Sequence, residues 1–270
     1  MPLTDHSVER YTVRFQDCNP CGHIHLHRLL DYAQDCDDRN CGLFGLKSDM
    51  LLKRGICWIL ISHATHFTGP FPVAEDTLIV DSWTRGTKGI RLYRDNRYYR
   101  NVVDDEHLFG TASSQWILSE LDTHRPLRPS DVTDVDDYNR RSDPTVGNMA
   151  RIPRLKPFAD DDDRAMLDME VQLGNLDTNT HLHSMHYVRA AVDAAGKHLA
   201  IDPWEEELIP VRFHIQFVSE MNYLDRMRVY LRPDGEDRVL LEGRHIDTGD
   251  TAFLSTLEYA VVPRSIEPTY

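Results

Sequence analysis

Apolar and polar positions in the first half of the chain predict a strand, one long helix and then several strands. The helix is indicated by apolar residues three or four positions apart, namely Leu26, Leu29, Leu30 and Ala33. Gly42 and Gly45 are expected to end it. Runs of alternating and β-branched residues predict strands at 8–17, 56–67, 77–84, 90–103 and 111–118.

The second half repeats this order, beginning with a short predicted strand at 170–173. Its helix is indicated by helically spaced apolar residues, which are Met185, Val188, Ala191, Val192 and Ala195. Gly196 is expected to stop this helix. Four more strands are predicted at 211–220, 226–232, 239–246 and 252–262. The pattern therefore predicts an α+β protein built from two similar halves.

The middle of the chain has the composition of a linker. Four aspartates lie within 131–137, four more fill 160–163, and prolines stand between the two runs. Both acidic runs are expected to be solvated loops. We therefore predict an N-terminal domain at 1–140, a linker at 141–168 and a C-terminal domain at 169–270.

The two halves align, which indicates a duplication. His23 and His181 lie 158 positions apart, and so do Val13 and Val171. Asp76 precedes one predicted strand and Asp225 precedes its counterpart.

The copies differ where chemistry is expected. The alignment sets Asp177 opposite Asn19, Asn179 opposite Cys21 and Glu220 opposite Phe71. We therefore predict one chemical copy, the second, and one copy that serves packing or substrate binding.

The turn before the second helix carries the candidate catalytic groups Asp177, Asn179 and His181, and Glu220 follows later. A helix start offers unpaired backbone N–H groups and a positive dipole end, which suit a reaction that develops negative charge. A simpler interpretation is that Asp177 and Asn179 only cap the helix.

Two segments of the second half carry a family resemblance. They are Asp177-Thr178-Asn179-Thr180-His181, followed by Tyr187, and Phe217-Val218-Ser219-Glu220-Met221. First-half segments fit the same pattern, namely Trp83, Arg94-Asp95, Ser113-Ser114-Gln115-Trp116 and 122–127. Over roughly residues 8–262 the chain resembles the plant-type acyl–acyl carrier protein (ACP) thioesterases, of which bacterial members exist.

The resemblance implies two tandem hotdog domains, each a long helix wrapped by an antiparallel β-sheet. It also implies hydrolysis of fatty acyl-ACP to free fatty acid and holo-ACP, in fatty acid biosynthesis, without a cofactor. The implied catalytic residues are Asp177, Asn179, His181 and Glu220. The first copy is then expected to supply much of the acyl pocket, with Trp58 and Phe71 as candidate lining residues.

The chain also departs from the family pattern. Met221 stands where many plant members have a cysteine, so a mechanism with a cysteine nucleophile there is excluded. His183-Ser184 replaces the usual Asn-Asn pair. The start of the sequence has no transit-peptide character, so we expect a bacterial member or a trimmed form.

Two carboxylates suit thioester hydrolysis. Asp177 and Glu220 are expected to activate water, while His181 and Asn179 position them and the thioester. Asp177 acting directly as a nucleophile, through an anhydride, stays open. The alternatives to an acyl-ACP thioesterase are an acyl-CoA thioesterase, a hotdog dehydratase and a non-catalytic acyl-binding protein.

The composition limits the classes of binding partner that the protein can have. The net charge of −14 over 270 residues argues against nucleic acid and anionic membranes, and no segment has the length of a membrane span. An acidic carrier protein would then need a local basic patch, and 84–100 or the group Arg151, Arg154 and Lys156 are candidates. A homodimer is compatible with the sequence.

The five cysteines form no disulfide pattern and suit a reducing cytoplasm, where we expect the protein. Cys18 and Cys21 lie near His23, His25 and His27, which invites a zinc interpretation. A second cysteine pair at suitable spacing is missing, so no metal site is predicted. The absence of a Gly-x-Ser-x-Gly motif argues against a serine hydrolase.

Overall fold

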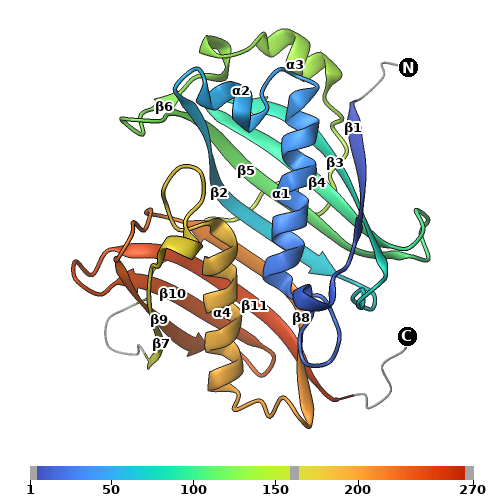
Figure 1. Ribbon diagram of the computed structural model, residues 1–270, viewed down its shortest axis with the longest axis vertical. Coiled ribbons are helices and arrows are strands. Elements are labelled where there is room, and N and C mark those ends of the chain that lie inside the picture. Colours follow the sequence, from blue (N-terminus) through green and yellow to red (C-terminus); the bar gives the residue numbers. More distant parts are fainter. Residues whose placement is uncertain (1–4, 159–163, 265–270) are drawn as a thin grey trace. The chain divides into compact units, whose positions relative to one another are not determined.

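The computed structural model describes residues 5–158 and 164–264, and the chain forms two compact units. The first unit comprises the chain up to Val13 together with Leu29–Ile152, and the second comprises Arg14–Arg28 and the chain from Pro153 onward. Each unit combines helix with an antiparallel sheet, so the fold is the predicted α+β pair of tandem hotdogs (Figure 1). Among the described residues, no helix has the length and hydrophobicity that a membrane crossing requires.

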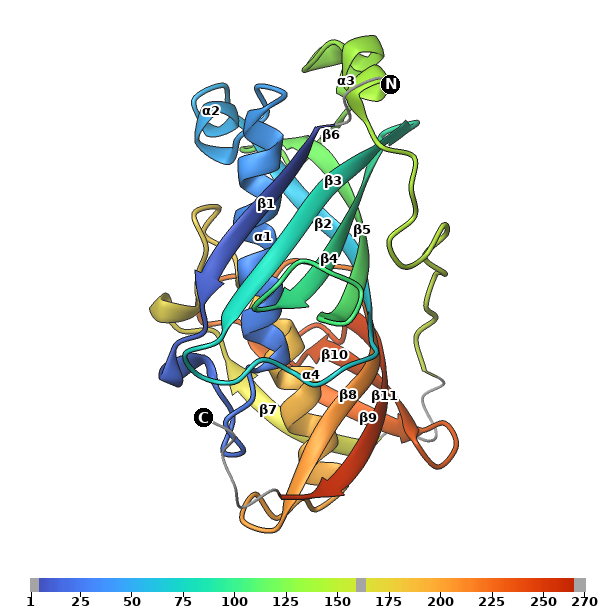
Figure 2. The same ribbon diagram turned by 90° about the vertical axis from the view of Figure 1, so that its right-hand side faces the viewer.

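The sheet of the first unit has the strand order β1-β3-β4-β5-β2, with every neighbouring pair antiparallel (Figure 2). Its strands are β1 (His6–Thr12), β2 (Ile56–Phe67), β3 (Thr77–Lys88), β4 (Arg91–Arg100) and β5 (Leu108–Glu120), and short β6 (Pro126–Leu127) pairs with β5. The helices are α1 (Leu26–Gly42), which this unit contains from Leu29 on, α2 (Ser48–Leu52) and α3 (Val135–Arg141).

Helix α1 is held on this sheet by polar contacts as well as by its apolar face. The carboxylate of Asp37 accepts hydrogen bonds from Ser82 Oγ at 2.6 Å and from Asn96 Nδ2 at 2.8 Å. The guanidinium of Arg94 lies 3.5 Å from the same carboxylate. All four side chains are buried, so the charges need these partners to avoid a large desolvation cost.

The sheet of the second unit has the order β8-β11-β10-β9-β7, again antiparallel throughout. The elements are β7 (Arg164–Glu170), α4 (Ser184–His198), β8 (Glu206–Phe217), β9 (Arg226–Pro233), β10 (Arg238–His245) and β11 (Thr251–Pro263). Helix α4 crosses the face of this sheet (Figure 1). Its buried alanines, including Ala191 and Ala194, bring the helix backbone close to the strands.

Two local expectations were wrong. Gly196 does not stop the second helix, because α4 continues to His198 and the chain turns at Ala200, whose φ is 52°. One glycine inside a helix costs only about 1 kcal/mol, which the buried face of α4 offsets.

The acidic run 131–137 is also more ordered than a loop. It leads into α3, and Asp134 caps that helix by accepting from the amides of Asp136 and Asp137 at 3.0 and 3.1 Å. The other acidic run, 160–163, lies outside the described residues.

The predicted duplication is visible in the backbone. The amide of Val13 donates to Asp76 O, and the amide of Val171 donates to Asp225 O, each at 2.9 Å. The residue before each aspartate has the same left-handed conformation, with φ 72° at Glu75 and 68° at Leu224. Equivalent segments of the two copies therefore fold in the same way.

Candidate functional site

A tight turn before α4 sets the position of His181. Asp177 Oδ1 accepts hydrogen bonds from the amides of Asn179 at 2.7 Å and His181 at 3.3 Å. The amide of Asp177 donates to His181 O at 2.8 Å, and Thr180 takes a left-handed φ of 66° to close the turn. The Asp177 carboxylate thus organises the backbone that carries both Asn179 and His181.

The first copy makes the same turn with an amide in place of the carboxylate. Asn19 Oδ1 accepts from the amides of Cys21 at 2.9 Å and His23 at 3.1 Å, and Gly22 supplies the left-handed residue with φ 87°. The turn therefore needs an oxygen acceptor at its first position but not a negative charge. The geometry of the turn therefore does not explain why the second copy has a carboxylate at Asp177.

Helix capping by Asp177 or Asn179 is not what the structure shows. The N-cap of α4 is His183, whose Nδ1 accepts from the amide of Met185 at 3.3 Å. One of the helix-start amides expected to be open for an oxyanion is therefore already used.

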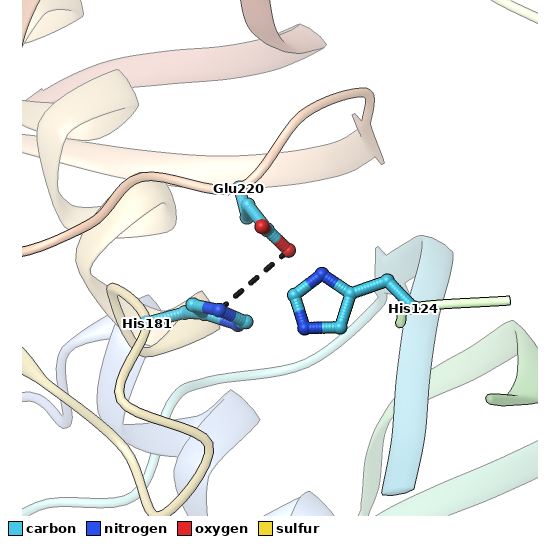
Figure 3. A group of neighbouring side chains, drawn as sticks. All are labelled: His124, His181 and Glu220. Atoms are coloured by element: carbon cyan, nitrogen blue, oxygen red, sulfur yellow. Dashed lines mark ion pairs between the residues drawn. The ribbon is translucent and has the colours of Figure 1, made fainter. Parts of the chain in front are cut away.

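Glu220 lies in a loop and not in the predicted strand 211–220. Strand β8 ends at Phe217, because the amides of Val218 and Ser219 both donate to Ala252 O, at 2.9 and 3.2 Å, and the ladder cannot continue. The loop places Glu220 Oε2 3.6 Å from His181 Nε2 (Figure 3). The side chain of His181 is 20% exposed and that of Glu220 is 41% exposed, so both are accessible.

The structure thus links the four predicted site residues in two steps. The turn fixes Asp177, Asn179 and His181 relative to one another, and an ion-pair contact joins His181 to Glu220. Asp177, Asn179 and His181 are all half-buried. An imidazole between two carboxylate-bearing segments can accept, hold and return a proton.

Neighbours on both sides hold the Glu220 loop. Ser219 Oγ donates to Thr251 O at 2.8 Å and lies 3.2 Å from His245 Nε2. Because the hydroxyl hydrogen is given to Thr251, His245 is the donor in the second contact. Ser219 and His245 are therefore not arranged as a nucleophile and its base.

On the other side, Met221 O accepts from the amide of Leu182 at 2.8 Å, and the buried ring of Tyr187 packs edge-on against Phe217. Burial raises the pKa of Tyr187, and the nearby charges of Glu220 and Asp177 raise it further, so its phenol stays neutral. The place of His245 beside Ser219 could not be predicted, because a histidine within the predicted strand 239–246 gives no signal of this contact.

In the first copy, an aromatic residue occupies the position of Glu220. Phe71 is buried and its ring centroid lies 4.7 Å from that of Phe67 and 6.0 Å from that of Phe109. Trp58 is half-buried, and its Nε1 donates to Leu46 O at 2.9 Å.

The first-copy turn has its own acid partner within the second unit. Glu207, on β8, lies 2.8 Å from His23 Nδ1 and 2.8 Å from Asn19 Nδ2. Burial alone would raise the pKa of Glu207, but these hydrogen bonds hold the pKa of that carboxyl below its ordinary value. Cys18 Sγ donates to Arg14 O at 3.5 Å, so this thiol and the His23 imidazole both have protein partners.

The basic segment 84–100 does not form the expected open patch. Arg85 and Arg94 have buried side chains that pair with Asp95 and Asp37. Arg100 pairs with an aspartate, and Arg97 lies over the ring of Trp83, which leaves Lys88 and Arg91 as the exposed basic residues of the segment. In the second predicted cluster, Arg151, Arg154 and Lys156 are all exposed.

The first half of the chain matches a known family model. Residues 5–135 match the family model of the acyl-ACP thioesterase N-terminal domain. No curated protein sequence matches the chain.

Solved structures share the fold over nearly the whole length. An acyl-ACP thioesterase from Bacteroides thetaiotaomicron is 16% identical, with a TM-score of 0.79 and coverage of 95% of this chain and 98% of that one. The 12:0-ACP thioesterase from Umbellularia californica is 15% identical, with a TM-score of 0.74 and coverage of 96% and 97%. At this identity the likeness establishes the tandem hotdog fold.

The family model covers the N-terminal half, the fold agrees over both halves, and the second copy carries the Asp-x-Asn-x-His turn with its glutamate. Residues 5–135 are thus similar to the acyl-ACP thioesterase N-terminal domain, and the chain as a whole shares the fold of solved acyl-ACP thioesterases.

Proposed function

We propose that this protein hydrolyses the thioester of fatty acyl-ACP to a free fatty acid and holo-ACP. The contact between His181 and Glu220, fixed by the Asp177 turn, is the observation that carries the proposal. The match of residues 5–135 to the acyl-ACP thioesterase N-terminal domain supports the reaction class, and the accessible pair supports the use of water as the nucleophile.

In the proposed reaction, Glu220 accepts a proton from a water that attacks the thioester carbonyl. The side-chain amide of Asn179 donates a hydrogen bond to the oxygen that becomes negative. His181 takes this proton from Glu220 and delivers it to the pantetheine sulfur when the C–S bond breaks, so Glu220 is again a carboxylate and the products are a carboxylic acid and a thiol. The charge of Asp177 stabilises the imidazolium form of His181 during this transfer.

Direct attack by Asp177 is the second route. The two backbone hydrogen bonds to its Oδ1 reduce its nucleophilicity, which favours the route through water. A single turnover in ¹⁸O-labelled water separates the two, because label incorporated into Asp177 would contradict direct water attack.

The first test is thiol release from a panel of acyl-ACP thioesters, with the CoA thioesters of the same chains beside them. We expect Asp177→Asn and Glu220→Gln to lower kcat at least a hundredfold while the control Glu236→Gln, on an exposed hairpin, keeps full activity. General acid–base groups contribute about 10² to 10⁴ in rate, which sets this expectation.

The alternatives predict other outcomes. Faster release from CoA than from ACP would identify an acyl-CoA thioesterase, and an enoyl product without free thiol would identify a dehydratase. Binding without turnover would leave an acyl-binding protein. Full activity in both variants would place the chemistry outside the Asp177 turn.

We also propose that the reaction takes place in the cytoplasm, as part of fatty acid biosynthesis. The five cysteines are free thiols, and Cys41 is buried, which raises the pKa of its thiol to about 11. A reducing compartment would keep them in this form.

A further inference from the structure

The loop that carries Glu220 leaves the second sheet at a β-bulge. The pairing of β10 with β11 skips Ala252, which is therefore the extra residue of the bulge. Its carbonyl accepts hydrogen bonds from the amides of Val218 and Ser219, at 2.9 and 3.2 Å. Because the two amides share one acceptor, the regular ladder ends here and the chain turns away from the sheet directly before Glu220.

The first copy builds the same backbone arrangement without a glutamate. The pairing of β4 with β5 skips Phe109, and Phe109 O accepts from the amides of Thr68 and Gly69, at 2.9 and 3.4 Å. Gly69 therefore has the place of Ser219, and it has no side chain that could hold the loop. The shared acceptor belongs to both copies, whereas a hydroxyl at this point belongs only to the copy with the glutamate.

The hydroxyl of Ser219 ties the loop to the β10–β11 hairpin. It donates to Thr251 O at 2.8 Å and accepts from His245 Nε2 at 3.2 Å. The hairpin is itself closed, because the amide of His245 donates to Asp250 O at 2.9 Å. The hydroxyl of Thr251 also donates to the buried carboxylate of Glu242, at 2.8 Å. The residue before Glu220 is thus fixed by its backbone and by its side chain.

We propose that Ser219 is a positioning residue for Glu220, and that its hydroxyl sets how closely the carboxylate approaches His181. The two side chains face each other at 3.6 Å, which is longer than a direct hydrogen bond, so a small movement of the loop decides whether a proton can pass (Figure 3). The inference rests on the proposed function, since it gives a reason for the placement of the proposed base. Ser219 does not exchange protons with substrate.

The test is Ser219→Ala, which removes the hydroxyl and leaves the backbone hydrogen bond to Ala252. Ser255→Ala is the matched control, because Ser255 is buried on β11 of the same unit and its hydroxyl has no hydrogen-bond partner among the described residues. We expect Ser219→Ala to lower kcat about tenfold with KM changed less than about twofold, and Ser255→Ala to change neither. Ser219→Thr keeps the hydroxyl and should retain kcat within about twofold of wild type.

A double variant shows whether the effect passes through Glu220. If it does, adding Ser219→Ala to Glu220→Gln should cost nothing further. An equal loss in that background, an unchanged kcat in Ser219→Ala, or no recovery in Ser219→Thr would each overturn the inference. Full activity of Glu220→Gln would instead refute the proposed function, so the two failures are distinguishable.

Discussion

At the scale of single residues, the two copies of the turn before each helix differ by one charged group. Asn19 and Asp177 each accept hydrogen bonds from the equivalent pair of backbone amides in their own copy, and only the second copy carries a carboxylate there. The first copy therefore acts as a natural control for what the fold requires of this position.

This comparison predicts that Asp177→Asn separates folding from chemistry. We expect the midpoint of thermal unfolding to stay close to that of wild type, because Asn19 shows that an amide closes the turn. Asp177→Ala removes the acceptor and should lower the free energy of unfolding by about 1–2 kcal/mol. Calorimetry of both variants beside their rates checks this, and a large drop in stability for Asp177→Asn would contradict it.

The sequence predicts the residues of this site but not the groups that support them, and the catalytic roles stay a prediction. Asp177, Asn179, His181 and Glu220 follow from a motif and its spacing. The contacts of Ser219 with Thr251 and His245 depend on which groups the folded chain brings together, and no side-chain pattern encodes that. The same limit explains why Glu220 was expected in a strand, since two amides sharing Ala252 O end β8 early.

At the scale of elements, the strand pattern located the strands of both sheets except β7, which lies at Arg164–Glu170 and not at the predicted 170–173. The ends of the elements and the short helices were harder to predict, because capping and turn residues determine them. Helix α3, for example, depends on the cap by Asp134 inside a run that composition alone assigns to a loop.

One contact between elements should make stability depend on pH. Glu207 on β8 binds His23 and Asn19 of the first-copy turn, and its pKa lies below the ordinary value. A carboxyl whose pKa is lowered in the folded state stabilises the fold at pH values above its ordinary pKa of about 4.3. This stabilisation is lost as the pH falls through the folded-state pKa. We expect Glu207→Gln to lower the free energy of unfolding by about 1–3 kcal/mol at pH 7.

Urea unfolding at pH 7 and near pH 3.5 measures this effect, with Glu205→Gln as an exposed neighbouring control. The difference between wild type and Glu207→Gln should shrink at the lower pH. A difference that stays constant would mean that the pair contributes no charge-dependent stability.

At the scale of the whole molecule, the order of the chain and the division into units do not coincide. Arg14–Arg28 is encoded in the first half, yet it belongs to the compact unit of the second. Its turn reaches Glu207, and Arg264 Nη2 donates to Pro20 O at 2.8 Å. Such contacts join residues far apart in sequence, so the repeat pattern could not predict them.

This arrangement leads us to expect that the second half cannot fold alone. Residues 141–270 without 14–28 would lack a segment of their compact unit, including His23 and Asn19, the partners of Glu207. Expressed alone, this fragment should lack a cooperative thermal transition by circular dichroism. Co-expression with residues 1–140 should restore the transition, because it supplies the missing turn. A fragment 141–270 that unfolds cooperatively by itself would show instead that the predicted C-terminal domain is independent.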